Sequence, residues 1–189
     1  MHESNVLMIL PHFVPDLYAG NYRRIIGLLN RGEKLCVNYV ALEFTPLTKF
    51  KDCIEQLVGR LHYKSIPVRA VGRGYSEERL PLLLFNSMKV LIAIAKVKKQ
   101  LIPDLVLIPD ILPSWVVIGF LVGKALNRPI IATVQLVPLW LLESSASDFK
   151  SLYRHFRSKY SLLKTLTYSI AAFLFTRMLS KCYLIFVSR

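Results

Sequence analysis

Two stretches of the chain hold polar and basic side chains where a ligand could be bound, and the first reads VLMILPHFVPDLYAGNYRRIIGLLNRG, residues 6–32. Its candidate substrate-binding residues are His12, Ala19, Gly20, Asn21 and Arg23. Gly20 allows the backbone to approach a ligand closely, and the free amides at the start of the following helix favour an anion such as a diphosphate or carboxylate. Arg23 and Arg24 add positive charge in the first helical turn. In the alternative interpretation Gly20 only permits a turn and the arginines are solvated.

The second stretch runs from Pro103 to Pro138, and in it Asp110 and Gln135 each follow an apolar run typical of a buried strand. If both runs belong to one parallel sheet, these two residues lie at the same edge as His12. A neighbouring His and Asp could act as a base and the group that orients it. Because no nucleophile lies nearby in the sequence, a loop histidine with a structural role is the alternative, and the catalytic residues stay unassigned.

Several classes of site lack their sequence signature. The dinucleotide fingerprint GxGxxG and the phosphate loop GxxxxGK[ST] are both absent from the first stretch. The three cysteines, Cys36, Cys53 and Cys182, are odd in number, widely spaced and in no Cys/His arrangement, so we interpret them as reduced packing residues. The sequence therefore predicts neither a metal site nor a cofactor.

The elements that would position these residues alternate between strand and helix. Strands are predicted over Val6–Leu10, Leu35–Leu42, Ser65–Val71, Asp104–Ile108, Pro129–Val134 and Tyr183–Val187. Helices are predicted from Asn21 to Gly32 and over Leu80–Leu101, Pro113–Leu126 and Leu162–Leu179, whereas residues 139–160 show no regular pattern. This alternation predicts an α/β fold with an open, doubly wound parallel sheet, in which ligands bind outside the carboxyl ends of the strands.

Composition indicates one domain and an anionic partner. The 189 residues are 53% hydrophobic and carry a formal net charge of +13, which suits a phosphate-bearing ligand, nucleic acid or an acidic membrane face. Nucleic acid is disfavoured, because the basic residues are scattered over several predicted helices and no helix-turn-helix, zinc-finger or RNP1-like pattern occurs.

The N-terminus has no basic region before its short apolar run, so we expect a cytoplasmic protein. Leu162–Leu179 is mostly apolar but contains Lys164 and Arg177, which favours a helix in the plane of a membrane interface over a spanning helix. The basic cluster over residues 150–159 adds attraction to anionic lipid, and peripheral binding at the inner membrane face would follow. The alternative is a helix packed on the sheet.

Together these stretches resemble the N-terminal half of retaining glycosyltransferases with the GT-B fold, of the glycosyl transferase group 1 and family 4 type. The similarity is in VLMILPHFVPDLYAGNYRRIIGLLNRG, in PDLVLIPD with NRPIIATVQ, and in TRMLSKCYLIFVSR. The chain has Ala19-Gly20 where the family often has Gly-Gly, and it has Pro109 and Gln135 where the family often has histidines. These departures leave Asp110 as the best candidate at that edge.

The resemblance implies that residues 1–189 form the acceptor-side domain of an enzyme that moves a sugar from a nucleotide sugar to a glycan or lipid-linked acceptor. The family's donor-binding domain, with its paired glutamates, has no counterpart in the sequence. The chain ends at Arg189, directly after a predicted strand, so we expect a second domain or chain to complete the enzyme. One alternative is a non-catalytic membrane-docking subunit that recruits a separate donor-binding chain. Another is a truncated, inactive product.

Overall fold

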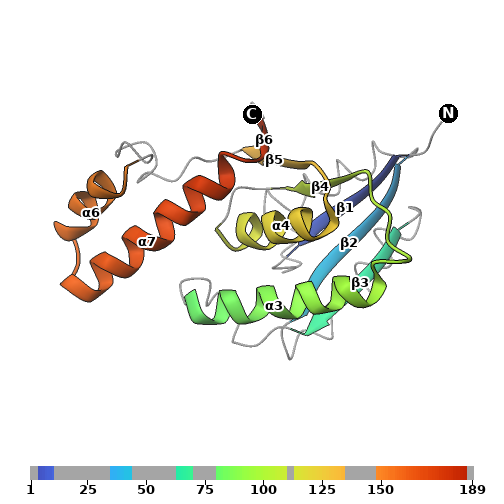
Figure 1. Ribbon diagram of the computed structural model, residues 1–189, viewed down its shortest axis with the longest axis horizontal. Helices are drawn as coiled ribbons and strands as arrows, with labels where there is room; N and C mark the ends of the chain where they lie inside the picture. Colours follow the sequence, from blue (N-terminus) through green and yellow to red (C-terminus); the bar gives the residue numbers. More distant parts are fainter. Residues whose placement is uncertain are drawn as a thin grey trace, which may run out of the picture.

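The computed structural model describes residues 4–10, 35–43, 63–69, 80–109, 113–134 and 148–186. The strands are β1 (Ser4–Leu10), β2 (Leu35–Glu43), β3 (Tyr63–Arg69), β4 (Leu105–Ile108), β5 (Ile130–Val134) and β6 (Tyr183–Phe186). The helices are α3 (Leu80–Val97), α4 (Pro113–Leu126), α6 (Phe149–Arg157) and α7 (Leu162–Leu179). Figure 1 shows the helices grouped beside the strands.

The described strands form one parallel six-stranded sheet in the order β3-β2-β1-β4-β5-β6. From β1 the chain steps outward to β2 and β3, returns through α3 to β4, and then steps outward in the other direction to β5 and β6. The order of the strands therefore reverses between β1 and β4, where Met8 pairs with Leu107. This confirms the predicted α/β class with an open, doubly wound sheet.

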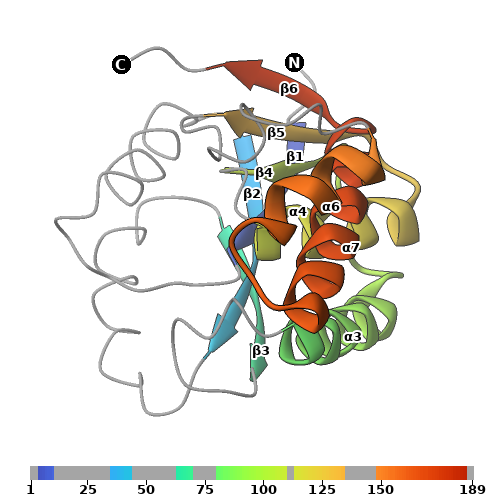
Figure 2. The same ribbon diagram turned by 90° about the vertical axis from the view of Figure 1, so that its left-hand side faces the viewer.

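The strand sequences are apolar because the sheet is covered. Four consecutive residues of β1, from Val6 to Ile9, are all buried, as expected for a parallel strand that is shielded on both faces. The main core combines strand and helix side chains, namely Leu7, Ile9, Ile66, Val68, Val90, Ile94, Leu101, Val106, Ile118, Val122 and Leu126. Turned by 90°, the ribbon shows α3, α4 and α7 on the same side of the sheet (Figure 2).

Most predicted elements are confirmed within one or two residues, but two predictions need correction. Helix α3 ends at Val97, four residues before the predicted end, because the Val97 carbonyl accepts the N–H groups of Gln100 and Leu101 in a closing turn. Residues 149–157, which were left without a predicted element, form α6. The predicted helix from Asn21 to Gly32 lies outside the described residues.

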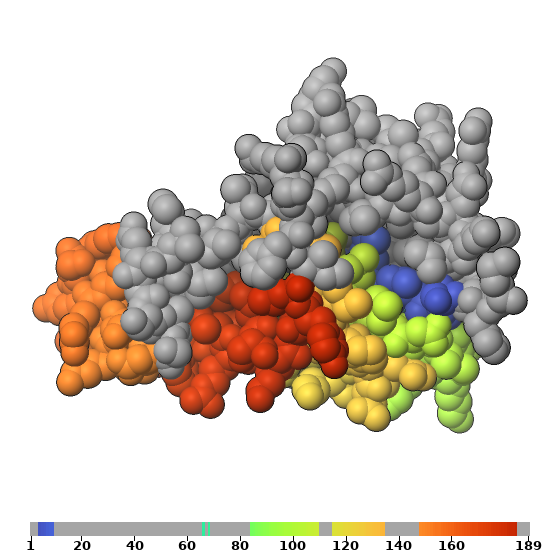
Figure 3. All heavy atoms as spheres, turned by 90° about the horizontal axis from the view of Figure 1, so that it is seen from above, coloured from blue at the N-terminus to red at the C-terminus, as the bar shows by residue number. Residues whose placement is uncertain are grey.

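Helices α6 and α7 pack together as a hairpin that extends away from the sheet, with α6 at the end of the molecule opposite β1 (Figure 3). The hairpin has a small core of its own, made by Leu152, Phe156 and Ala172 with Tyr168 and Phe173 against it. Helix α7 also packs on α4. The hairpin therefore has a core separate from that of the sheet.

Candidate functional site

The carboxyl ends of β1, β4 and β5 lie side by side at one edge of the sheet, because these strands are parallel neighbours. The reversal of strand order between β1 and β4 falls at this edge. In open parallel sheets, the two connections on either side of such a reversal leave in opposite directions, which opens a crevice for ligands. We call this edge, from the end of β1 to the end of β5, the ligand edge.

A side-chain hydrogen bond joins the ends of β4 and β5 at the ligand edge. The buried hydroxyl of Thr133 donates to the carbonyl oxygen of Pro109. Pro109 comes one residue before Asp110, and Thr133 comes two residues before Gln135. The hydrogen bond therefore holds together the backbone segments that lead into both predicted site residues. Thr133 was not among the predicted site residues.

Helix α4 begins at the ligand edge and lies close to the sheet because of two glycines one turn apart. A Cβ atom at Gly119 would come 2.5 Å from Cγ1 of Ile108, and one at Gly123 would come 2.3 Å from Cγ1 of Ile130. These separations are too short for carbon atoms, so larger residues would push the helix away from β4 and β5. The close fit fixes the N-terminus of α4, whose free amides favour anions, next to the end of β4.

All seven predicted site residues lie outside the described residues: His12, Ala19, Gly20, Asn21, Arg23, Asp110 and Gln135. For three of these residues, the structure places the strand that comes directly before them. His12 comes after β1, Asp110 after β4 and Gln135 after β5, and these three strands are adjacent. The prediction that they share one edge is consistent with the sheet order, and their contacts stay a prediction.

One further feature near the ligand edge went unrecognised in the sequence. Trp115, in the first turn of α4, is buried. Its Nε1 has no hydrogen-bond partner, and it is the single buried side-chain nitrogen or oxygen atom of this kind among the described residues. A buried unpaired donor costs free energy. No pattern in the sequence distinguishes this tryptophan from an ordinary core residue.

In the part of the chain that the structure describes, two titratable groups have clearly shifted pKa values, Cys182 and Asp148. Burial raises the pKa of the Cys182 thiol to about 11, so this thiol is protonated and a poor nucleophile at neutral pH. The pKa of Asp148 is lowered by hydrogen bonds from the Lys150 backbone and the Ser151 hydroxyl. Within the described ranges, no three His, Cys, Asp or Glu side chains lie close enough together to hold a metal ion.

No family model matches the chain. No curated protein matches it either. Solved structures do. The UDP complex of UDP-glucose: anthocyanidin 3-O-glucosyltransferase superposes with a TM-score of 0.53 and 14% identity, over 99% of this chain and 53% of that one. UGT89C1 of Arabidopsis thaliana complexed with UDP gives 0.51 and 14%, over 99% and 45%. The glycotransferase of kitacinnamycin gives 0.51 and 14%, over 94% and 39%.

These similarities define the class of fold. The chain has the α/β fold of the GT-B glycosyltransferases, with a parallel Rossmann-like sheet. At such low identity the likeness concerns the fold alone. The chain also spans only about half, or less, of the length of the three structures it matches.

Proposed function

We propose that the chain is the N-terminal, acceptor-side domain of a retaining GT-B glycosyltransferase of the group 1 and family 4 type. The complete enzyme would move a sugar from a nucleotide-sugar donor to a glycan or lipid-linked acceptor. In this proposal residues 1–189 are one domain, and the donor-binding domain belongs to another segment or another chain. The chain alone then transfers sugar poorly or not at all.

The observation that carries the proposal is the reversal of strand order at the ligand edge. It brings the ends of β1, β4 and β5 together, and the segments after these strands contain His12, Asp110 and Gln135. The Thr133 hydrogen bond and the close seat of α4 hold that edge in place. Carboxylate and amide side chains there can bind sugar hydroxyls, while the start of α4 favours a phosphate.

A reconstitution assay tests this function. The purified chain is incubated with a panel of radiolabelled UDP- and GDP-sugars and an extract of the native cells from which the chain has been removed. We expect transfer only when chain and extract are combined. Asp110→Asn should lower the rate roughly tenfold, because a charged carboxylate accepts a hydrogen bond worth about 1.5–3 kcal/mol and the neutral amide oxygen that replaces it accepts one worth about 0.5–1.5 kcal/mol. Gly20→Val should reduce ligand binding more than it reduces the free energy of unfolding.

Asp104→Asn is the matched control at the amino edge of the sheet. The Asp104 carboxylate accepts the backbone N–H of Asn5 at 2.8 Å, and an asparagine oxygen can accept the same bond, so transfer should be unchanged. Transfer that is insensitive to Asp110→Asn, or equal losses of binding and stability in Gly20→Val, would contradict the proposed role of the ligand edge.

The second candidate is a non-catalytic subunit that docks on a membrane and recruits a separate donor-binding chain. The apolar outer face of α7 and the basic residues around it favour this candidate. Purification of the chain from its native source distinguishes the two. A subunit should bring down a second polypeptide, whereas a covalently complete enzyme should give a mass well above the 21.7 kDa of this sequence.

A further inference from the structure

Helix α7 exposes large apolar side chains that an ordinary surface helix would bury. The side chains buried on it are Thr165, Ser169, Ala172, Phe175 and Leu179. The large apolar side chains exposed on it are Leu162, Leu163, Leu166, Ile170 and Leu174. These five, which we call the outer stripe, are between 41% and 76% exposed, and Leu163 is the most exposed. A surface helix normally turns its aliphatic residues inward.

Two small hydroxyl residues are buried on the inner face of α7, where their hydroxyls have backbone carbonyl oxygens as acceptors. The Thr165 hydroxyl reaches the carbonyl oxygens of Phe156 and Tyr160, at 3.4 and 3.2 Å, where α6 ends. The Ser169 hydroxyl donates to the Thr165 carbonyl at 2.6 Å. The small side chains let α6 approach closely, and their hydroxyls are bonded to backbone oxygens. The hydroxyl groups on the inner face of α7 therefore have their hydrogen-bond acceptors within the hairpin.

Other hydroxyls of α7 are also bonded within the helix. Thr167 donates to the Leu163 carbonyl and Thr176 to the Ala172 carbonyl, both at 2.9 Å. A hydroxyl that bonds its own helix needs no water partner. For the exposed Thr167 hydroxyl, this bond lowers the cost of moving its side of the helix into a less polar medium.

The hairpin and the strand that follows it carry almost only positive charge. Residues 148–186 contain seven basic side chains and one acidic side chain. The basic ones are Lys150, Arg154, Arg157, Lys159, Lys164, Arg177 and Lys181. Arg177 lies on the same side of the helix as Ile170 and Leu174, with its guanidinium 5.0 Å from the centre of the Phe173 ring. A segment that is both apolar on one face and positively charged complements a partner that is apolar and negatively charged at once.

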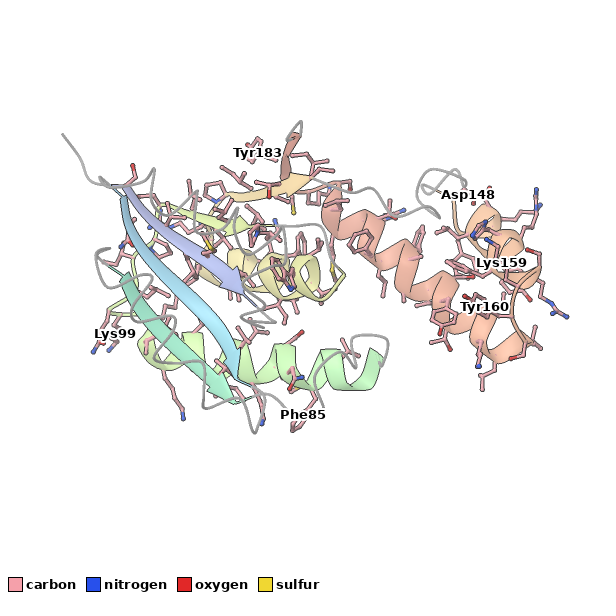
Figure 4. The ribbon with its side chains drawn as sticks, turned by 180° about the vertical axis from the view of Figure 1, so that it is seen from behind. Phe85, Lys99, Asp148, Lys159, Tyr160 and Tyr183 are labelled. Atoms are coloured by element: carbon pink, nitrogen blue, oxygen red, sulfur yellow. The ribbon has the colours of Figure 1, made fainter. Side chains whose placement is uncertain are left out.

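The position of the hairpin adds a geometric argument. The arrowheads of β1 and β2 point toward the end of the molecule from which α6 and α7 project (Figure 4). Lys159 and Tyr160 are at that projecting end, and Lys99 is at the opposite end (Figure 4). The outer stripe begins there with Leu162 and Leu163.

We propose that the α6–α7 hairpin docks on an anionic lipid bilayer. The outer stripe enters the boundary between headgroups and acyl chains, and the lysines and arginines of the hairpin bind lipid phosphates. A lipid surface fits better than nucleic acid, because nucleic acid offers no apolar medium for five exposed leucine and isoleucine side chains.

The structure favours a helix that lies on the membrane. By length and apolar composition, α7 is the one helix in the described part of the chain that could cross a bilayer. Its 18 residues would span about 27 Å. However, its inner face is occupied by α6 and α4, and Lys164 and Arg177 lie within its length. A helix with one satisfied face and one apolar face belongs in the plane of the interface.

Docking of this kind would hold the ligand edge near the membrane, because the hairpin projects from the same end of the molecule. A lipid-linked acceptor would then be the natural substrate class. This consequence rests on the proposed glycosyltransferase function. The docking itself does not.

Vesicle flotation tests the docking with the full chain. Vesicles of phosphatidylcholine with 30% phosphatidylglycerol should bind the protein, and vesicles of phosphatidylcholine alone should bind it much less. Leu163→Ser and Leu166→Ser should each lower the partition coefficient roughly tenfold, because each removes apolar side-chain surface from lipid. Lys159→Gln and Lys164→Gln should each lower it roughly fivefold on anionic vesicles. High salt should mimic the charge variants.

Ile102→Ser and Met88→Ser are the matched controls, since both side chains are more than half exposed and neither belongs to the hairpin. They should leave vesicle binding unchanged. The proposal is overturned if the wild-type chain does not float with anionic vesicles, or if Met88→Ser on α3 reduces binding as much as Leu163→Ser. It is also overturned if Leu163→Ser instead dissolves a dimer seen by sedimentation, which would make the stripe a contact between copies. Sugar transfer is not read in this assay, so its result does not depend on the proposed enzyme function.

Discussion

At the scale of single residues, the distance between α4 and the sheet depends on two positions without a Cβ atom. Gly119 and Gly123 face the isoleucines at the end of β4 and the start of β5. Glycine inside a helix normally costs about 1 kcal/mol relative to alanine. The close contact with Ile108 and Ile130 is the structural reason for that cost here.

Gly119→Ala should therefore destabilise the protein, although alanine is the better helix former. The added methyl would collide with the buried Ile108 side chain, and overpacking costs about 1–3 kcal/mol. We expect a net loss of up to about 2 kcal/mol in the free energy of unfolding, measured by urea denaturation.

The control for this substitution is Ala125→Gly on the same helix, where the side chain is exposed. It should cost about 1 kcal/mol through helix propensity alone. A gain in stability for Gly119→Ala would mean that α4 can move away from β4 without penalty. The close packing of α4 on the sheet would then not depend on Gly119.

At the scale of elements, α6 depends on a cap that the sequence analysis did not recognise. The Asp148 carboxylate accepts the backbone N–H groups of Lys150 and Ser151 at 3.1 and 3.2 Å. Leu152 and Phe156, four residues apart, are the buried residues of the helix. With only two buried positions in nine residues, the pattern was too short to separate from an irregular segment.

Asp148→Ala should increase hydrogen exchange at the amides of Lys150 and Ser151 and fray the start of α6. The effect of pH follows from the lowered pKa of Asp148. The carboxylate stabilises the folded form above the unfolded pKa of about 4, and this contribution is lost as pH falls through the lower folded pKa. Capping should thus be complete at neutral pH and fail only in acid.

Asp148→Asn is the comparison that separates charge from hydrogen bonding. Asparagine is also a good cap and does not titrate in this range. It should protect the same amides at neutral pH and remove the acid dependence. If the aspartate and asparagine forms lose protection at the same acidic pH, another group controls the fraying.

At the scale of the whole molecule, the sheet core and the hairpin core are separate clusters, and this should appear as two levels of stability. The hairpin core around Leu152 contains few residues, whereas the core around Val106 unites strands with α3 and α4. Small clusters open at lower free energy than the global transition. The hairpin would then be the less stable part of the protein.

Leu152→Ala should lower the opening free energy of α6 and the first half of α7 by about 2–4 kcal/mol and leave the exchange of β1 and β4 amides nearly unchanged. Val106→Ala should instead lower the global free energy of unfolding. Native-state hydrogen exchange measures both. Equal effects of Leu152→Ala on the hairpin and on β1 would show one cooperative unit.

Much of the sheet could be predicted from the sequence because its signals are local. Strands such as β1 are short apolar runs, and a parallel sheet buries both of their faces. Helix α4 carries its own boundaries: Pro113 suits the first turn, and Asn127, with a φ of 53°, closes a Schellman turn in which the Arg128 N–H donates to the Gly123 carbonyl. The class of fold follows from the order of these elements.

Tertiary structure decided what depends on neighbours far apart in the chain. The sequence of α7 is apolar nearly all round, so only its packing on α6 and α4 determines that Thr165 and Ser169 turn inward and the outer stripe outward. Likewise, Thr133 has significance only because β5 lies beside β4, where its hydroxyl meets the Pro109 carbonyl. The sequence by itself determined where elements form, because backbone hydrogen bonding and apolar spacing are local. Which faces meet, and which remain exposed, was decided by long-range packing.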